Sequence, residues 1–324
     1  MFLEIIAIII GLAALVWSAD KFVDGAAATA AHFHVPPLII GMVIIGFGTS
    51  APELVVSASS ALEGNPGIAL GNAYGSNIAN IGLILGFTAL LSPIAVHSQV
   101  LKKELPILLF VTLVLTWAVW DLDVTRIDSI VMLLVFASVM GWTIRQGIKH
   151  SPDGLSADVE RDLAAHEMPL KHALAWLAVG IVVLAASSKS LVWGASGVAS
   201  ALGVSDLIIG LTVVAIGTSA PELASSLAAL RKNQHDLVLG NVIGSNLFNT
   251  LAVVGLAGVI QPMKAPAEVI TRDTFVLCGM TLLLLIFCFG FKGPKKINRI
   301  EGGVLLSIFI AYTSWLIYVV ISAV

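Results

Sequence analysis

Long, continuous apolar stretches restrict the fold of this chain more than any other feature. A helix needs roughly 20 apolar residues to cross a bilayer, and about ten segments meet that length. They lie near residues 1–24, 36–61, 68–91, 103–120, 127–145, 171–199, 205–230, 236–260, 273–291 and 300–322. Only 11% of the residues are charged, whereas soluble proteins contain about 25%. The predicted fold class is therefore an all-α polytopic membrane protein with ten transmembrane helices.

A sequence repeat divides the chain into two halves. Residues 48–54, GTSAPEL, recur without change at 217–223, an offset of 169 residues. At the same offset, the GNxxGSN motif of residues 71–77 recurs at 240–246. Five helices per half is an odd number, so the two halves must lie in opposite orientations, as in many secondary transporters. We expect a first repeat over 1–145, a cytoplasmic linker over 146–170 and a second repeat over 171–324.

Basic residues predict the orientation of the chain, because loops rich in Lys and Arg stay in the cytoplasm. Loops after odd-numbered helices contain Lys102, Lys103, Arg145, Lys149, Arg161, Lys171, Arg231, Lys232, Lys292, Lys295, Lys296 and Arg299. Loops after even-numbered helices contain Arg126, Lys264 and Arg272. Both termini should therefore lie outside. The basic residues are explained by topology, and we expect a lipid bilayer but no nucleic acid as a partner.

Each half carries one glutamate in the middle of an apolar segment, Glu53 in the first and Glu222 in the second. An ionisable side chain at that depth costs about 3 kcal/mol, so it is a functional candidate. Helix packing explains small polar residues well, but it does not require a carboxylate in both halves. On a continuous helix, Thr49 and Ser50 would share the face of Glu53. Thr218 and Ser219 precede Glu222 in the same way.

The next helix of each half adds a stripe of polar residues spaced four apart. The stripes consist of Asn72, Ser76 and Asn80, and of Asn241, Ser245 and Asn249. Pro52 and Pro221 lack a backbone N–H, so they should free carbonyl oxygens near Gly46 and Ala215. Carboxylates, hydroxyls, amides and carbonyls are ligands for hard cations such as Ca²⁺ and Na⁺. The absence of Cys and His from these stretches argues against zinc or copper.

The repeated motifs GTSAPE and GNxxGSNxxN resemble the two α-repeats of the cation/calcium exchanger superfamily, and most closely its bacterial sodium/calcium exchanger-like branch. The resemblance implies a secondary active calcium/sodium antiporter of a bacterial or archaeal inner membrane. Such a protein is not an enzyme and needs no cofactor, and calcium and sodium are its transported substrates. In the first half, the resemblance implies ligands at Thr49, Ser50, Glu53, Ser76 and Asn80 and at the Gly46 carbonyl. In the second half, it implies Thr218, Ser219, Glu222, Ser245 and the Ala215 carbonyl.

One residue departs from the family pattern. Relatives often carry an aspartate where this chain has Asn249, so the site has two acids and is more symmetric. The departure leaves the ion stoichiometry open. The large calcium-regulatory loop of animal exchangers is also missing, so direct sensing of cytosolic calcium is not expected.

Three alternatives accompany this prediction. A calcium/proton antiporter would use the same fold and the same two glutamates. A passive cation channel would also place acids in a pore, but a doubled Gly/Pro-broken motif favours a transporter. The sequence Gly-Ala-Ser-Gly at 194–197 fits a rhomboid-like intramembrane serine protease. That enzyme needs a membrane-embedded histidine as its base, and no later span contains one.

Overall fold

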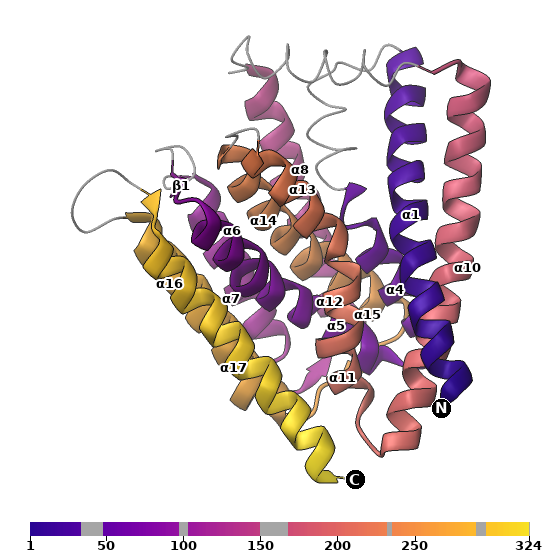
Figure 1. The fold of residues 1–324 in the computed structure, drawn as a ribbon, viewed down its shortest axis with the longest axis vertical. Helices are drawn as coiled ribbons and strands as arrows, with labels where there is room; N and C mark the ends of the chain where they lie inside the picture. Colours follow the sequence, from indigo (N-terminus) through magenta and orange to yellow (C-terminus); the bar gives the residue numbers. More distant parts are fainter. Residues whose placement is uncertain (34–47, 97–102, 150–167, 232–234, 290–295, 324) are drawn as a thin grey trace.

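The computed structural model describes residues 1–33, 48–96, 103–149, 168–231, 235–289 and 296–323, and this part of the chain is almost entirely helical (Figure 1). Eight of its helical stretches are long and apolar enough to cross a membrane. They span Phe2–His32, Pro66–Leu91, Arg126–Arg145, Leu170–Leu202, Asp206–Arg231, Leu237–Ile260, Val269–Phe289 and Arg299–Val319. The predicted all-helical membrane class is therefore confirmed.

The count of ten spans is not confirmed. Helix α7 (Leu105–Ala118), expected as a span over 103–120, is apolar but has only 14 residues. The expected span 36–61 lies partly outside the described residues, and its described helix is α4 (Ala51–Leu62). Most of the expected linker, 146–170, also lies outside them.

The two longest helices, α1 (Phe2–His32) and α10 (Leu170–Leu202), lie side by side along one edge of the molecule (Figure 1). Glycines allow the two backbones to approach closely. A Cβ added to Gly25 would lie 2.8 Å from the Ala173 carbonyl oxygen, too close for any side chain. The close contacts involve Gly11 and Gly25 of α1 and Gly180 and Gly194 of α10. The second two glycines lie 169 residues after the first two, so both halves use the same positions.

Two rod-like segments form the buried centre. The first consists of α5 (Pro66–Ala79), η2 (Asn80–Leu85) and α6 (Gly86–Leu91). The second consists of α14 (His235–Phe248), η5 (Asn249–Val253) and α15 (Val254–Ile260). Each rod changes from α-helix to π-helix at an asparagine of the polar stripe, Asn80 or Asn249. Such π-helical segments occur often at functional sites.

The GTSAPE segments are broken helices that lie against these rods. In the second half, α11 (Asp206–Ile209), η4 (Gly210–Val214) and α12 (Ala215–Thr218) lead to a break at Ser219, after which α13 (Ala220–Arg231) begins. In the first half, Thr49 and Ser50 form a turn before α4. The proline of each motif is the second residue of the new helix, where a missing N–H is tolerated.

The remaining helices pack around the centre: α7, α8 (Arg126–Lys149), η6 (Val269–Thr274), α16 (Phe275–Phe289) and α17 (Arg299–Ala323). Two short antiparallel ladders connect the halves. Strand β1 (Ile94–Ala95) pairs with β4 (Lys296–Ile297), and β2 (Asp123–Val124) pairs with β3 (Met263–Lys264). Each ladder therefore joins a strand of one half to a strand of the other.

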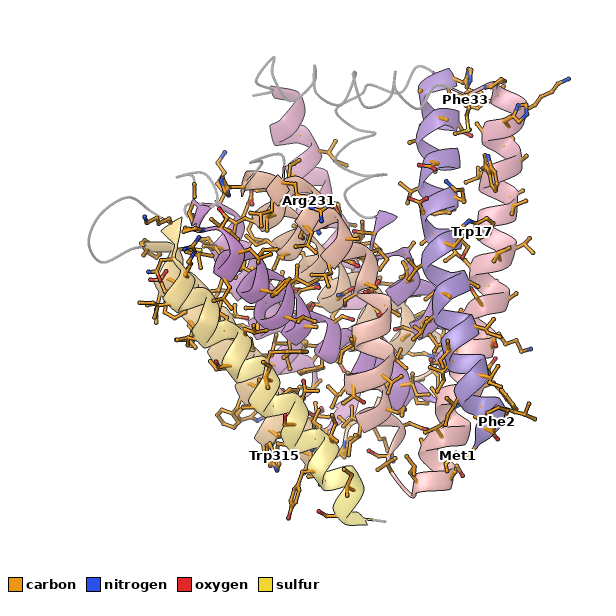
Figure 2. The ribbon with its side chains drawn as sticks, in the orientation of Figure 1. Met1, Phe2, Trp17, Phe33, Arg231 and Trp315 are labelled. Carbon is orange, nitrogen blue, oxygen red and sulfur yellow. The ribbon has the colours of Figure 1, made fainter. Side chains whose placement is uncertain are left out.

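The labelled side chains mark the two ends of the molecule. Phe33 and Arg231 lie at one end of the molecule, and Met1 and Trp315 lie towards the other (Figure 2). Arg272 was expected in a loop, but this prediction is wrong. Arg272 lies in η6, is only 9% exposed, and forms a two-point ion pair with Asp273 at 2.6 and 3.0 Å. The ion pair explains why a charged Arg272 is buried, so this residue is not evidence for the orientation of the chain in the membrane.

Candidate cation site

Glu53 and Glu222 are fully buried, and both are 0% exposed. Each stands in the first turn of its helix, Glu53 in α4 and Glu222 in α13. The first N–H groups of a helix have no partner within the helix and favour negative charge nearby. The break in each GTSAPE segment therefore places a carboxylate where the backbone favours its charged form.

Serines hold each glutamate from the opposite half of the chain. The Ser50 hydroxyl donates to Glu222 Oε1 at 2.9 Å, and the Ser219 hydroxyl donates to Glu53 Oε1 at 3.4 Å. Ser245 also donates to Glu222 Oε1, at 3.3 Å. The expectation that Ser50 shares a helical face with Glu53 is wrong, because Ser50 lies in the turn before α4 and reaches across to Glu222. The two halves therefore build a single site.

Two asparagines brace the glutamate backbones in the same way. Asn72 donates to the Glu53 carbonyl at 3.3 Å and to the Ser57 hydroxyl at 3.0 Å. Asn241 donates to the Glu222 carbonyl at 3.0 Å and to the Ser226 hydroxyl at 2.9 Å. These bonds fix each broken helix on its central rod, so both asparagines and both serines act in positioning the glutamates.

Further polar contacts join the two halves close to the glutamates. Thr218 donates to Asn72 Oδ1 at 3.0 Å, and the Ser76 hydroxyl lies 3.4 Å from the Thr218 hydroxyl. The central rods bond through Asn80 Nδ2 and Asn246 Oδ1 at 3.0 Å. Asn77 Nδ2 donates to the Thr250 hydroxyl at 2.8 Å.

Several buried polar atoms of the predicted ligands have no hydrogen-bond partner among the described residues. They are Thr49 Oγ1, Glu53 Oε2, Asn80 Oδ1, Glu222 Oε2, and both Oδ1 and Nδ2 of Asn249. Burying a polar atom is costly unless it gains a partner, and a bound cation supplies one to an oxygen. Within the described ranges, no group of three or more His, Cys, Asp or Glu side chains could hold a metal. An oxygen-rich site with two acids fits Ca²⁺ or Na⁺ better than zinc.

Two predicted ligands need separate comment. Gly46 lies outside the described residues. The Ala215 carbonyl, which Pro221 was expected to free, accepts hydrogen bonds from the Ser219 N–H at 3.1 Å and the Thr218 hydroxyl at 3.3 Å. In this conformation the Ala215 oxygen is therefore engaged within its own chain segment.

Asn77, Asn246 and Thr250 were not among the predicted site residues, although they link the two rods beside it. Asn77 and Asn246 are equivalent positions in the repeated GNxxGSN motif, so the repeat contained a signal for both. Thr250 has no such signal, because the equivalent residue in the first half is Ile81. A search for symmetric polar pairs cannot find a residue that is polar in one half only.

Ser196, the serine of the protease-like sequence, takes part in a contact between helices. Its hydroxyl accepts a hydrogen bond from Asn65 Nδ2 at 2.9 Å, which links α10 to the turn between α4 and α5. A serine nucleophile needs a base within hydrogen-bond reach. The contact with an amide explains this serine as a link between helices.

Comparisons with known proteins show the family of this chain. The profile of a family described as "Sodium/calcium exchanger protein" matches residues 3–145 and 172–318. The chain is 44% identical over 314 residues to "Putative antiporter CaxA" of Alkalimonas amylolytica, covering 96% of this chain and 98% of that protein. It is 29% identical to "Sodium/calcium exchanger MaX1" of Methanosarcina acetivorans, with coverage of 96% and 98%.

Solved structures give the same result. A structure of the sodium-calcium exchanger NCX_Mj soaked with Na⁺ and Sr²⁺ aligns with a TM-score of 0.65 at 33% sequence identity. The alignment covers 97% of this chain and 98% of that one. The similarity extends over nearly the whole length of both chains, so it includes the central rods and the long edge helices.

Proposed function

This chain belongs to the sodium/calcium exchanger family of cation antiporters, and on that premise we propose that it exchanges calcium for sodium by alternating access. The family resemblance of the repeated motifs is thereby confirmed, and the relatives are named as antiporters and exchangers, not enzymes. The observation that carries the proposal is the pair of buried glutamates from opposite halves. Each has one carboxylate oxygen held by a serine of the other half and one without a described partner.

The charge of the site supports a divalent cargo. Two carboxylates balance one Ca²⁺, and their charge is otherwise costly to keep away from water. When calcium is not bound, sodium ions on the same oxygen atoms would balance that charge during the return step of the transport cycle. A protein with neither ion bound would have to move two uncompensated charges past an apolar barrier. Obligatory exchange follows, because the unloaded site resists crossing.

We propose that the domains are two inverted repeats of five helices, 1–145 and 171–324, separated by a cytoplasmic linker. The equivalent positions of Glu53 and Glu222, and of the π-helical turns at Asn80 and Asn249, support this plan. The chain is an integral membrane protein. The bacterial and archaeal relatives favour a cell membrane of such an organism, its inner membrane where there are two, and the basic residues favour an orientation with both termini outside.

Twelve residues form the proposed ligand set. They are Gly46, Thr49, Ser50, Glu53, Ser76, Asn80, Ala215, Thr218, Ser219, Glu222, Ser245 and Asn249. The unpartnered oxygens of Thr49, Glu53, Asn80, Glu222 and Asn249 support the set most directly. The Ala215 carbonyl would have to exchange an internal hydrogen bond for the cation.

A calcium/proton antiporter is the second candidate. The same two glutamates are buried without a basic partner among the described residues, so they can also hold protons in place of cations. The fold would be unchanged, and only the counter-ion would differ.

The experiment is radiocalcium uptake into proteoliposomes loaded with sodium and diluted into buffer free of sodium and potassium. Glu53→Gln and Glu222→Gln are compared with Glu63→Gln, a change of an exposed glutamate just after α4. Sodium/calcium exchange requires uptake that depends on the sodium gradient, is lost in the first two variants and is kept in the third. Uptake only under an imposed pH gradient would reject sodium coupling in favour of protons.

A further inference from the structure

Hydrogen bonds fasten the long helix α10 to α4. The Ser188 hydroxyl lies 2.9 Å from the Ser59 hydroxyl and 3.2 Å from the Val55 carbonyl oxygen. Further along the same helix, the Ser196 hydroxyl accepts from Asn65 Nδ2 at 2.9 Å, and Asn65 lies in the turn between α4 and α5. Ser188 is fully buried, so its hydroxyl depends on these partners.

The repeat does not preserve these bonds. The equivalents of Ser188 and Ser196 in α1 are Ala19 and Ala27, and the equivalent of Ser59 in α13 is Ala228. None of these alanines can form a side-chain hydrogen bond. The contact between α1 and α10 behaves differently, because its four glycines occur at equivalent positions in both helices. The two long helices thus form a symmetric pair that is fastened to the rest of the protein asymmetrically.

Burial shows the same asymmetry. Ala51 and Val56 of α4 are buried, whereas their equivalents in α13, Ala220 and Ser225, are exposed. The described conformation therefore covers α4 at these positions and leaves the equivalent positions of α13 uncovered. If the two inverted halves packed in the same way, burial at these equivalent positions would be equal. The structure therefore shows one arrangement, with α4 more covered than α13, and the inverted plan implies a second one with the two exchanged.

We propose that Ser188 and Ser196 are positioning residues that hold the α1–α10 pair over α4 and thereby favour the conformation with α13 exposed. The inference rests on the proposed alternating access. In the opposite conformation, the pair covers α13 and uncovers α4, and the alanines at the equivalent positions offer no replacement bonds. The two access states therefore differ in free energy because the repeat is imperfect at these sites.

Removing both hydroxyls should raise the population of the opposite conformation. Each neutral hydrogen bond contributes modestly to an equilibrium, and losing two corresponds to roughly a tenfold shift. The bonds lie outside the cation site, so they bias the two states of the loaded protein whichever ion it carries. The shift should appear as greater access of a labelling reagent to the positions of α4 that are buried in the described conformation.

The test is the rate of maleimide labelling of single cysteines in proteoliposomes that hold equal sodium and calcium concentrations on both sides, so that the loaded protein can reach both conformations. Cys278→Ala and Cys288→Ala remove the native thiols, and Val56→Cys or Ser225→Cys then provides one reporter. The test variant combines Ser188→Ala with Ser196→Ala. Ser187→Ala is the matched control, because the Ser187 hydroxyl bonds within its own helix to the Val183 carbonyl at 2.6 Å.

Labelling of a buried thiol follows the population of the state that exposes it. We expect labelling of Val56→Cys to rise about tenfold in the double variant, with no rise at Ser225→Cys and no change in the control. Asn65→Ala removes the donor of the hydrogen bond to Ser196 and leaves the Ser188 bonds in place. It should raise labelling of Val56→Cys by a smaller factor. Unchanged labelling at Val56→Cys, or a rise at both reporters, would overturn the inference. Labelling requires no transport, so this result is independent of which ion is exchanged.

Discussion

The Ser50 hydroxyl donates a 2.9 Å hydrogen bond to Glu222, the buried glutamate of the opposite half. The reciprocal bond, from Ser219 to Glu53, is longer at 3.4 Å. Each carboxylate is thus oriented by a residue about 170 positions away in the chain. Neither half can orient its own glutamate through these bonds, so the site exists only when both halves are packed together.

The difference between the two crossed bonds should appear in calcium affinity. Ser50→Ala removes the shorter hydrogen bond to a glutamate, and it also removes a proposed ligand oxygen. We expect the Kd for calcium to rise about tenfold. Ser219→Ala should raise the Kd by a smaller factor, about threefold. Titration calorimetry of the purified proteins measures both. Ser60→Ala is the control, because the Ser60 hydroxyl bonds to the Val56 carbonyl of its own helix. Equal effects of Ser50→Ala and Ser219→Ala would contradict the prediction.

Asn249→Asp should make sodium a stronger competitor. Asn249 is fully buried, and neither polar atom of its side chain has a partner among the described residues. A third carboxylate there adds a negative charge near two others and attracts an additional monovalent cation. We expect half-maximal inhibition of calcium uptake at a sodium concentration about threefold lower. Asn298→Asp, at the start of α17, introduces the same change far from the site and should leave the value unaltered.

Gly75→Ala should disrupt transport through packing alone. A Cβ on Gly75 would lie 2.6 Å from both the Ala215 Cβ and the Leu211 carbonyl oxygen. The backbones of α5 and η4 would have to separate, which moves Ser76 away from Thr218. We expect calcium uptake to fall more than about tenfold and the unfolding temperature to decrease. Gly279→Ala is the control, since an added Cβ would meet no described atom within 4 Å. Normal uptake by Gly75→Ala would show that this close approach is not required.

Asp273→Asn should destabilise the outer helices. Asp273 bonds to Arg272 and accepts a 2.7 Å hydrogen bond from the Tyr312 hydroxyl, which joins η6 to α17. Losing the carboxylate charge leaves a buried guanidinium without its counter-ion, at a cost of about 3–5 kcal/mol. Tyr312→Phe removes only the hydroxyl and should cost less, about 1–3 kcal/mol. Thermal unfolding in detergent measures both, and the reverse order of the two variants would disprove this account of the pair.

The sequence by itself determined the class of the protein and the equivalence of its two buried glutamates. The apolar stretches require membrane helices because uncovered backbone groups are too costly in lipid. The offset of 169 residues identified Glu53 and Glu222 as equivalent positions, and their burial at the centre agrees with that prediction. These properties follow from composition and spacing along the chain, which do not depend on how the helices pack.

The tertiary structure alone decided which groups meet. Sequence spacing placed Ser50 beside Glu53, but the break before α4 turned it towards Glu222. The spacing also gave no sign of the π-helical turns or of the bond between Asn77 and Thr250. The two repeats are similar in sequence, yet α10 is bonded to α4, while Ala220 and Ser225 of α13 are exposed. Periodicity describes the faces of one helix, whereas contacts between helices depend on breaks, close approaches and the one arrangement that the packed chain adopts.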